Sequence, residues 1–288
     1  MRSLSSDSEM KKVKRLDSDL LCETYDDFGW VLIKGLVCTG KLEKLRSYIS
    51  DVMAAGFAES IGVVQVAELD LDNAFQVLDL DDKQILRLIS LVKNSVPFFS
   101  IMVDENIMEA VKLLQKSNHV HCVHDIAQFR IDPYERSPRL FGWHQDYPYN
   151  QTSIDAITAW IPLTTVDLSV GPIELIPASQ NAEVVVKHCE GKKQNIGDTN
   201  KVIEFELPGN LLEQAVTAPH MDPGDVLFFH SKLLHRSGTN VNKEACRWIC
   251  NPRYSNSMDK ELVSRKWLSV TDRNVGTMIE EYVAKLSK

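Results

Sequence analysis

Up to about residue 117, the chain carries apolar residues at the three- and four-residue spacing of a helix face. The spacing is clearest in KLEKLRSYISDVM and recurs over residues 75–92, and a short helix is also predicted over residues 17–28. The exception is WVLIKGLV, residues 30–37, whose continuous apolar character predicts a strand. Residues 15–117 are therefore predicted to be mostly helical, after a polar stretch, residues 1–14, that we expect to be disordered.

Residues 118–258 show a different pattern, in which short β-rich runs are separated by Pro, Gly and Asn. The runs are VHCVHDIAQFRID, ITAWIPLTTV, GPIELIPAS, KVIEFELP, DVLFFH and CRWICNPRY. Short strands without helices between them favour a sandwich or double-sheet jelly roll over a parallel sheet. A helical segment, residues 259–288, is predicted to close the chain. Because no repeat, low-complexity tract or linker divides the sequence, residues 1–288 are predicted to form one domain, mainly β with flanking helices.

Composition narrows the possible partners. A hydrophobic content of 44% and a charged content of 25% are ordinary for a globular protein, and a net charge of −8 without a long basic patch argues against nucleic acid. The six cysteines are scattered and are predicted to be reduced thiols; Cys246 and Cys250 are interpreted as small core residues rather than a metal pair. With no signal-peptide pattern and no apolar stretch of membrane-spanning length, we expect a cytoplasmic protein without a membrane partner. The oligomeric state is left open.

The segment GWHQDYPYNQ contains the first candidate for metal chemistry, His144 with Asp146. In an extended chain, side chains two residues apart share a face, so this imidazole and carboxylate could reach one ion. A second imidazole would complete the facial triad that leaves three positions open for non-haem Fe(II) chemistry. The similar pairs His220–Asp222 and His188–Glu190 are predicted to lie at a turn and in a polar surface loop. The position of His144 among aromatic residues, ahead of an apolar strand, favours it.

The region DVLFFHSKLLHRSGTNVNKEACRWICNPRY offers two histidines as the third ligand. His230 ends an apolar strand and could be a core residue, whereas His235 precedes a turn, RSGTN, that would bring the next strand back beside it. Twelve residues after His235, Arg247 lies in an apolar strand, where burying a guanidinium is costly unless it meets a carboxylate or phosphate. Its partner is either an anionic ligand or an acid of the chain itself.

Together, His144-Gln145-Asp146, the later FFHSKLLHRSGTN and Arg247 resemble the phytanoyl-CoA dioxygenase superfamily of Fe(II)- and 2-oxoglutarate-dependent oxygenases. FGWVLIKGLV followed by KLEKLRSYI is similar to that family's opening segment, and GPIELIPAS to its segment after the metal-binding loop, so the resemblance covers nearly the whole chain. It implies a double-stranded β-helix, a cupin-like jelly roll, buttressed by N-terminal and C-terminal α-helices. The chain departs from the family at Ala178-Ser179-Gln180, where relatives often have Gly-Ser-His, and in one extra residue between the distal histidine and the arginine.

The resemblance also implies roles for individual residues. The implied iron ligands are His144, Asp146 and His235. The implied cosubstrate residues are Arg247 at the far carboxylate of 2-oxoglutarate, Ser237 assisting it, and Trp160 beside it. O2 and 2-oxoglutarate would be consumed, succinate and CO2 released, and an unactivated C–H bond hydroxylated. Asp146 favours hydroxylation over halogenation, because relatives with a small residue there can place a halide on iron.

The substrate is predicted to be a small metabolite, with an anionic one favoured. Gln128 and Arg130 share one face of a predicted strand, and Asn251 and Arg253 share the face of Arg247. The predicted substrate residues are Gln128, Arg130, Tyr147 and Arg253. The alternative for each is surface solvation or an internal salt bridge. Two other functions stay open: a non-catalytic jelly-roll ligand-binding protein, and a metal-dependent cupin-like isomerase that needs no oxygen.

Overall fold

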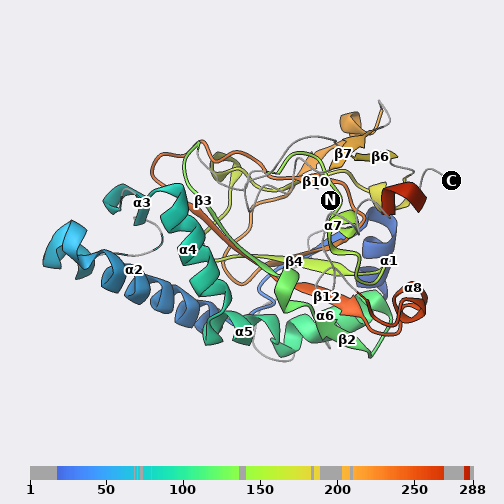
Figure 1. The fold of residues 1–288 in the computed structure, drawn as a ribbon, viewed down its shortest axis with the longest axis horizontal. Coiled ribbons are helices and arrows are strands. Elements are labelled where there is room, and N and C mark those ends of the chain that lie inside the picture. The colour runs from blue at the N-terminus through green and yellow to red at the C-terminus, as the bar shows by residue number, and fades with distance from the viewer. Residues whose placement is uncertain are drawn as a thin grey trace.

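The computed structural model describes residues 18–67, 69, 71, 74–78, 80–135, 141–182, 185–188, 203–207, 210–268 and 282–285. Figure 1 shows four helices gathered along one side of the strands: α2 (Thr39–Ala67), α4 (Asp82–Lys93), α5 (Val96–Met102) and α6 (Glu105–Gln115). The small strands β6 (Val185–His188), β7 (Ile203–Glu206) and β10 (His235–Arg236) lie on the other side. The predicted disordered stretch and most of the predicted C-terminal helical segment lie outside the described residues. Within that C-terminal segment, residues 282–285 are described and are helical.

Helices dominate the N-terminal part, as predicted. They are α1 (Ser18–Phe28), α2 (Thr39–Ala67), α3 (Ala74–Val77), α4 (Asp82–Lys93), α5 (Val96–Met102) and α6 (Glu105–Gln115). The helical pattern of residues 75–92 is divided between α3 and α4. Asp81 is the N-cap of α4 and begins a new helix there. Its side chain accepts a hydrogen bond from the Gln84 N–H, and the Gln84 side chain accepts one from the Asp81 N–H. Two further short helices, α7 (Tyr147–Asn150) and α8 (Lys260–Ser264), follow later in the chain.

The strands pair antiparallel throughout the described sheets. The seven-stranded sheet contains β1 (Trp30–Ile33), β9 (Val226–His230), β4 (Ile157–Pro162), β11 (Arg247–Asn251), β3 (Gln128–Asp132), β12 (Arg253–Asn256) and β2 (Val120–Cys122). A three-stranded sheet contains β10 (His235–Arg236), β5 (Glu174–Leu175) and β8 (Val216–Thr217), and a two-stranded one contains β6 (Val185–His188) and β7 (Ile203–Glu206). The predicted strand over residues 30–37 is shorter than expected, and it joins the large sheet beside β9. The large sheet is not closed as a barrel.

Alternation along the central strands separates two hydrophobic clusters. Phe228 and Trp248 belong to the cluster that also contains the buried faces of the helices. Their neighbours Phe229 and Ile249 point to the other side and join the second cluster with Trp160. Burial of each large apolar side chain contributes about 1.5–3 kcal/mol, so both clusters anchor the sheet. Arg247 and Asn251, two residues either side of Ile249, consequently face away from the helices.

The described cysteines are free thiols. Cys246 and Cys250 are buried, as predicted for core residues, and burial raises the pKa of the Cys250 thiol. Among the described residues no single helix has the length and apolarity to cross a membrane, although one bent pair, Asp82–Lys93 with Val96–Gln115, meets both criteria taken together.

Candidate active site

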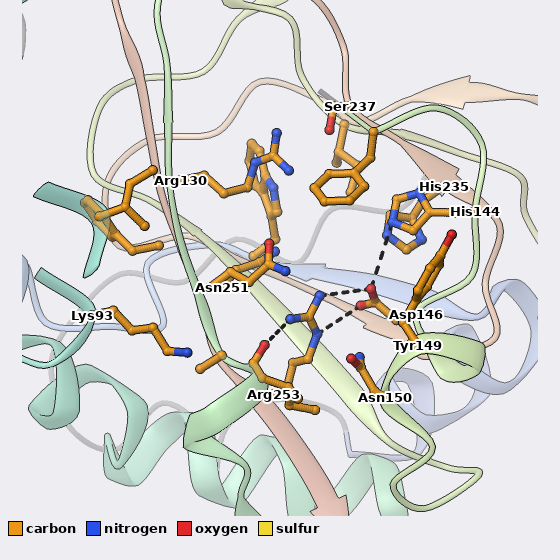
Figure 2. A pocket seen from close by; sticks show the side chains of 18 of the residues that line it. Lys93, Arg130, His144, Asp146, Tyr149, Asn150, His235, Ser237, Asn251 and Arg253 are labelled. Carbon is orange, nitrogen blue, oxygen red and sulfur yellow. Dashed lines mark hydrogen bonds and ion pairs between the residues drawn. The ribbon is translucent and has the colours of Figure 1, made fainter. Parts of the chain in front are cut away.

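A cavity of about 530 Å³ lies beside the large sheet, lined both by residues of the second cluster and by helix α4. Its lining includes apolar residues from several elements, among them Ile89, Phe129, Phe141, Ile173 and Phe229. Figure 2 shows His144, Asp146 and His235 together on one side of this cavity and Lys93 on the opposite side. The cavity therefore combines apolar walls with polar and charged side chains on more than one side.

One group of these polar side chains consists of three potential metal ligands. His144, Asp146 and His235 are buried, and each offers a ligand atom within 4.8 Å of the others. The two histidines are held by an isolated antiparallel bridge, with His144 N to His235 O and His235 N to His144 O both 3.0 Å. Asp146 is not on a strand: its backbone lies in the helical region just before α7. Strand alternation therefore does not explain why the pair converges; a bridge followed by a turn does.

Both histidines present the same ring nitrogen. His144 Nδ1 lies 2.7 Å from the Gly142 carbonyl, and His235 Nδ1 lies 2.9 Å from the Leu233 carbonyl. A carbonyl oxygen can only accept, so each Nδ1 carries the proton and each Nε2 has its lone pair available. Burial, together with the neighbouring His235, lowers the pKa of His144 to about 3, and burial also lowers the pKa of His235. Both imidazoles are thus neutral at pH 7, the form that binds metals.

Asp146 is held in its ionised form. Burial alone would raise the pKa of this carboxyl, but Arg253 and the two histidines hold it well below its usual range. Arg253 donates from Nη2 to Oδ1 at 2.9 Å and from Nε to Oδ2 at 3.2 Å, while Thr158 Oγ1 donates to Oδ2 at 2.7 Å. Oδ1 also lies 3.9 Å from His144 Nε2. Two neutral imidazoles and one carboxylate are the donor set of the iron facial triad, so these residues fit Fe(II).

A second buried cluster joins Arg130, Asp132 and Arg247 at the cavity wall. Arg247 is 2% exposed and donates from Nε and Nη2 to Asp132 Oδ2, at 3.2 and 2.8 Å. Arg130 binds the same carboxylate through Nε and Nη2, at 3.2 and 3.0 Å. Asp132 and Arg247 are direct partners across β3 and β11. The acid that the sequence left open as the partner of Arg247 is therefore Asp132, and among the described residues two arginines share this one carboxylate.

Two backbone carbonyls complete the surroundings of Arg247. Its Nη1 donates to Val170 O at 3.2 Å and to Gly238 O at 3.0 Å. The loops that supply them touch closely at Gly171 and Gly238, where an added Cβ would collide with the backbone of the opposite loop. Gly171 also has a φ of +70°, which disfavours other residues. This close approach is what places both carbonyls on the guanidinium.

The remaining predicted residues are placed as follows. The cavity is lined by the predicted residues Gln128, Arg130, Trp160, Ser237, Arg247 and Arg253, together with Asn251. The Asn251 Oδ1 atom is buried without a protein partner, so it is an acceptor that a ligand could satisfy. Tyr147 is not in the lining; its ring packs against Tyr282, with the centroids 5.7 Å apart. Its position one residue after Asp146 suggested the cavity, but α7 turns it away.

The competing histidines lie elsewhere. His230 ends β9, and its Nδ1 accepts from the Lys232 N–H at 3.0 Å. His220 is bound to Asp222 at an exposed turn, as predicted. His188 was predicted to lie in a surface loop, but it ends β6, where it pairs with Ile203. Within the described residues, the only group that could hold a metal through three such side chains is the one containing His144.

Sequence reasoning missed Asp132 and Thr158. Asp132 is two residues after Arg130 in the predicted strand QFRID, so the alternation that placed Arg130 in the cavity would have placed this acid beside it. Thr158 had no such signal, because its role depends on pairing with Arg253 across β4 and β12.

The fold and the site together define an iron- and 2-oxoglutarate-dependent oxygenase, and comparison with known proteins gives the family. The phytanoyl-CoA dioxygenase family profile matches residues 25–247, so the chain belongs to that family. One similar protein is 1-deoxypentalenic acid 11-beta-hydroxylase from Streptomyces exfoliatus, which is 25% identical over 239 residues that cover 78% of this chain and 76% of that protein. The predicted class of enzyme and its cofactors, Fe(II) and 2-oxoglutarate, are confirmed by this membership.

Solved structures confirm the predicted jelly-roll fold with flanking helices. The epimerase SnoN in complex with Fe3+, alpha ketoglutarate and nogalamycin RO aligns with a TM-score of 0.54 at 16% identity, covering 83% of this chain and 84% of that chain. EctD from S. alaskensis with bound Fe aligns with a TM-score of 0.52 at 15% identity, covering 83% and 76%. At these identities the likeness establishes the fold alone.

Proposed function

We propose that this dioxygenase hydroxylates an unactivated C–H bond of a small organic anion. The observation that carries the proposal is the buried His144–Asp146–His235 group, whose two Nε2 lone pairs face one carboxylate beside a cavity. Fe(II) held there would couple the conversion of 2-oxoglutarate and O2 into succinate and CO2 to insertion of the second oxygen atom into the substrate. The bacterial relative is named as the hydroxylase of an acid, which supports this reaction and substrate class.

The charges of the cavity support an anionic substrate. Four cationic side chains line it, Lys93, Arg130, Arg247 and Arg253, against two acidic ones, Asp125 and Asp146. Asp132 behind the wall offsets one more positive charge, and the metal would add two. Because 2-oxoglutarate carries two negative charges, a positive remainder would be left for a substrate carboxylate.

Each chain residue then has a defined task. The one N–H of Arg247 that Asp132, Val170 and Gly238 do not use, together with the Ser237 hydroxyl, binds the far carboxylate of 2-oxoglutarate. Trp160 and Phe229 close the sheet side of the cavity and exclude water. Lys93, Arg130 and Asn251 orient the substrate anion, and the unpaired Asn251 Oδ1 requires a donor on the bound molecule.

The test uses purified protein with Fe(II), 2-oxoglutarate and 18O2, and a panel of small carboxylic acids with their methyl esters. We expect succinate and a hydroxylated product, each containing one 18O atom, from an acid but not from its ester. The His144→Ala variant should form neither succinate nor hydroxylated product. Failure to bind both Fe(II) and 2-oxoglutarate would falsify the activity, product formation without O2 would favour an isomerase, and turnover of esters alone would contradict the anionic substrate.

A further inference from the structure

The carboxylate of Asp146 has one acceptor position left after the protein's own hydrogen bonds are counted. Its two oxygens offer about four lone-pair sites. Oδ2 accepts from Thr158 Oγ1 and from Arg253 Nε, and Oδ1 accepts from Arg253 Nη2. The remaining site is on Oδ1, the oxygen that faces His144 Nε2 at 3.9 Å. Oδ2 is saturated, so only one oxygen of the carboxylate is available to a metal.

The two donors lie on paired strands of the large sheet, whereas the carboxylate that they hold does not. Thr158 and Arg253 are direct partners across β4 and β12, and both side chains are buried. Arg253 is fixed further by a hydrogen bond from Nη1 to the Ile126 carbonyl. Asp146, by contrast, lies on a turn before the short helix α7. The sheet therefore sets the orientation of the carboxylate (Figure 2).

This orientation matters because a carboxylate can bind a divalent cation through one oxygen or through both. A facial triad with one-oxygen binding leaves three metal positions open, two for the keto acid of 2-oxoglutarate and one for O2. If Asp146 bound through both oxygens, one of those positions would be lost. We propose that Arg253 and Thr158 are positioning residues that restrict Asp146 to its Oδ1 atom and so keep the third position open.

The proposal rests on the proposed function and differs from a purely structural role. If Arg253 and Thr158 only neutralise and stabilise a buried acid, removing a donor should weaken metal and cosubstrate binding together. If they restrict the carboxylate, removing a donor lets Oδ2 turn toward the metal. Metal affinity is then kept, while 2-oxoglutarate binding, which needs two free positions, is weakened.

The experiment measures the two affinities separately in the full-length protein under anaerobic conditions. Co(II) binding is followed by calorimetry, and 2-oxoglutarate is then titrated into the Co(II)-loaded protein with the visible Co(II) absorption as the signal. The variants are Thr158→Val, which removes the hydroxyl at nearly constant volume, and Arg253→Lys, which keeps the charge but loses the two-nitrogen fork. Thr158→Ser, which keeps a hydroxyl, is the matched control, and circular dichroism checks that each variant is folded.

For Thr158→Val we expect a Co(II) affinity within about threefold of wild type and a 2-oxoglutarate affinity about tenfold lower; Arg253→Lys should lower the latter by up to about 100-fold. Thr158→Ser should retain both, and the Co(II) spectra of the first two variants should differ from that of wild type before 2-oxoglutarate is added. An unchanged 2-oxoglutarate affinity, or a Co(II) affinity that falls as much, overturns the proposal. If wild type itself binds neither Co(II) nor 2-oxoglutarate, it is the proposed function that fails.

Discussion

Asp146 and Asp132 are both buried carboxylates bound by arginine, yet the two clusters suit ligands of opposite charge. Asp146 meets one guanidinium and keeps an acceptor site directed at two neutral imidazoles. Asp132 meets two guanidinium groups, so among the described partners in this cluster the positive charge exceeds the negative. The same pair of residue types thus prepares one side of a cavity for a cation and another side for an anion, and the ratio of arginine to carboxylate decides which.

The largest expected effect tests the cation side. His144→Ala removes one Nε2 ligand, and we expect Co(II) affinity to fall by at least about 100-fold, far more than the roughly threefold limit expected for Thr158→Val. Calorimetry measures it. The control is His220→Ala, which disrupts the other His-x-Asp pair, at an exposed position where His220 is 55% accessible in its side chain. Equal losses in both variants would refute the assignment of the metal site to His144.

Substitution in the Arg130–Asp132–Arg247 cluster is expected to lower the free energy of unfolding. Asp132→Ala leaves Arg130 and Arg247 buried without their carboxylate, and breaking a buried ion pair in this way costs about 3–5 kcal/mol. Urea unfolding measures the free-energy change. Asp125→Ala is the matched control, because the Asp125 side chain is 70% exposed and should change stability by less than about 0.5 kcal/mol. A loss below about 1 kcal/mol for Asp132→Ala would show that the cluster is not held as described.

Arg247→Lys is expected to change the affinity for 2-oxoglutarate without changing the affinity for the metal. The lysine keeps the charge but cannot reproduce the planar fork, so we expect 2-oxoglutarate affinity to fall by about 1.5–3 kcal/mol, roughly 10–100-fold. Co(II) affinity should be unchanged, since the metal group lies on the other cluster. Arg236→Lys is the control, because Arg236 binds Glu174 and is not in the cavity lining. Titration of the Co(II)-loaded proteins reports both affinities, and equal effects of the two substitutions would contradict a special role for Arg247.

The smallest effect concerns pH. The pKa of His144 is about 3 in the folded protein against 6.5 for the free side chain. The unfolded chain therefore takes up its proton first as the pH falls, so the stability that depends on neutral His144 is present above 6.5 and is lost toward 3. Between pH 7 and 5 this loss is about 2 kcal/mol. Urea unfolding of metal-free protein should show it, and His144→Gln should have a flatter profile; an equally steep one would contradict the assignment.

The helices and the β core could be predicted because each has a local signal. Apolar spacing marked the helices, and turn residues divided the strands. Even the break between α3 and α4 has a local cause, since Asp81 and Gln84 form a capping box. Likewise the ligand candidates were marked by a short motif and by a turn after His235. Local signals suffice where the structure depends on neighbours in sequence.

The rest of the site depends on register between distant strands. Asp132 and Arg247 are 115 residues apart, and only the alignment of β3 with β11 makes them partners. The contact of Thr158 with Asp146 requires β4, β12 and α7 to meet at one point. Arg253, which was predicted to contact substrate, lines the cavity, and the sequence did not show that its guanidinium binds Asp146 and the Ile126 carbonyl. A sequence shows that a buried arginine needs an acid without showing which acid it finds.

The touching loops at Gly171 and Gly238 set a limit for anyone who reshapes this enzyme. A methyl group at either position would wedge the loops apart and withdraw the Val170 and Gly238 carbonyls from the guanidinium that they hold. Mutant libraries aimed at new substrates should therefore leave both codons fixed. Diversity is better directed at Leu86 and Ile89 on α4, whose side chains border the cavity without supporting either charged cluster.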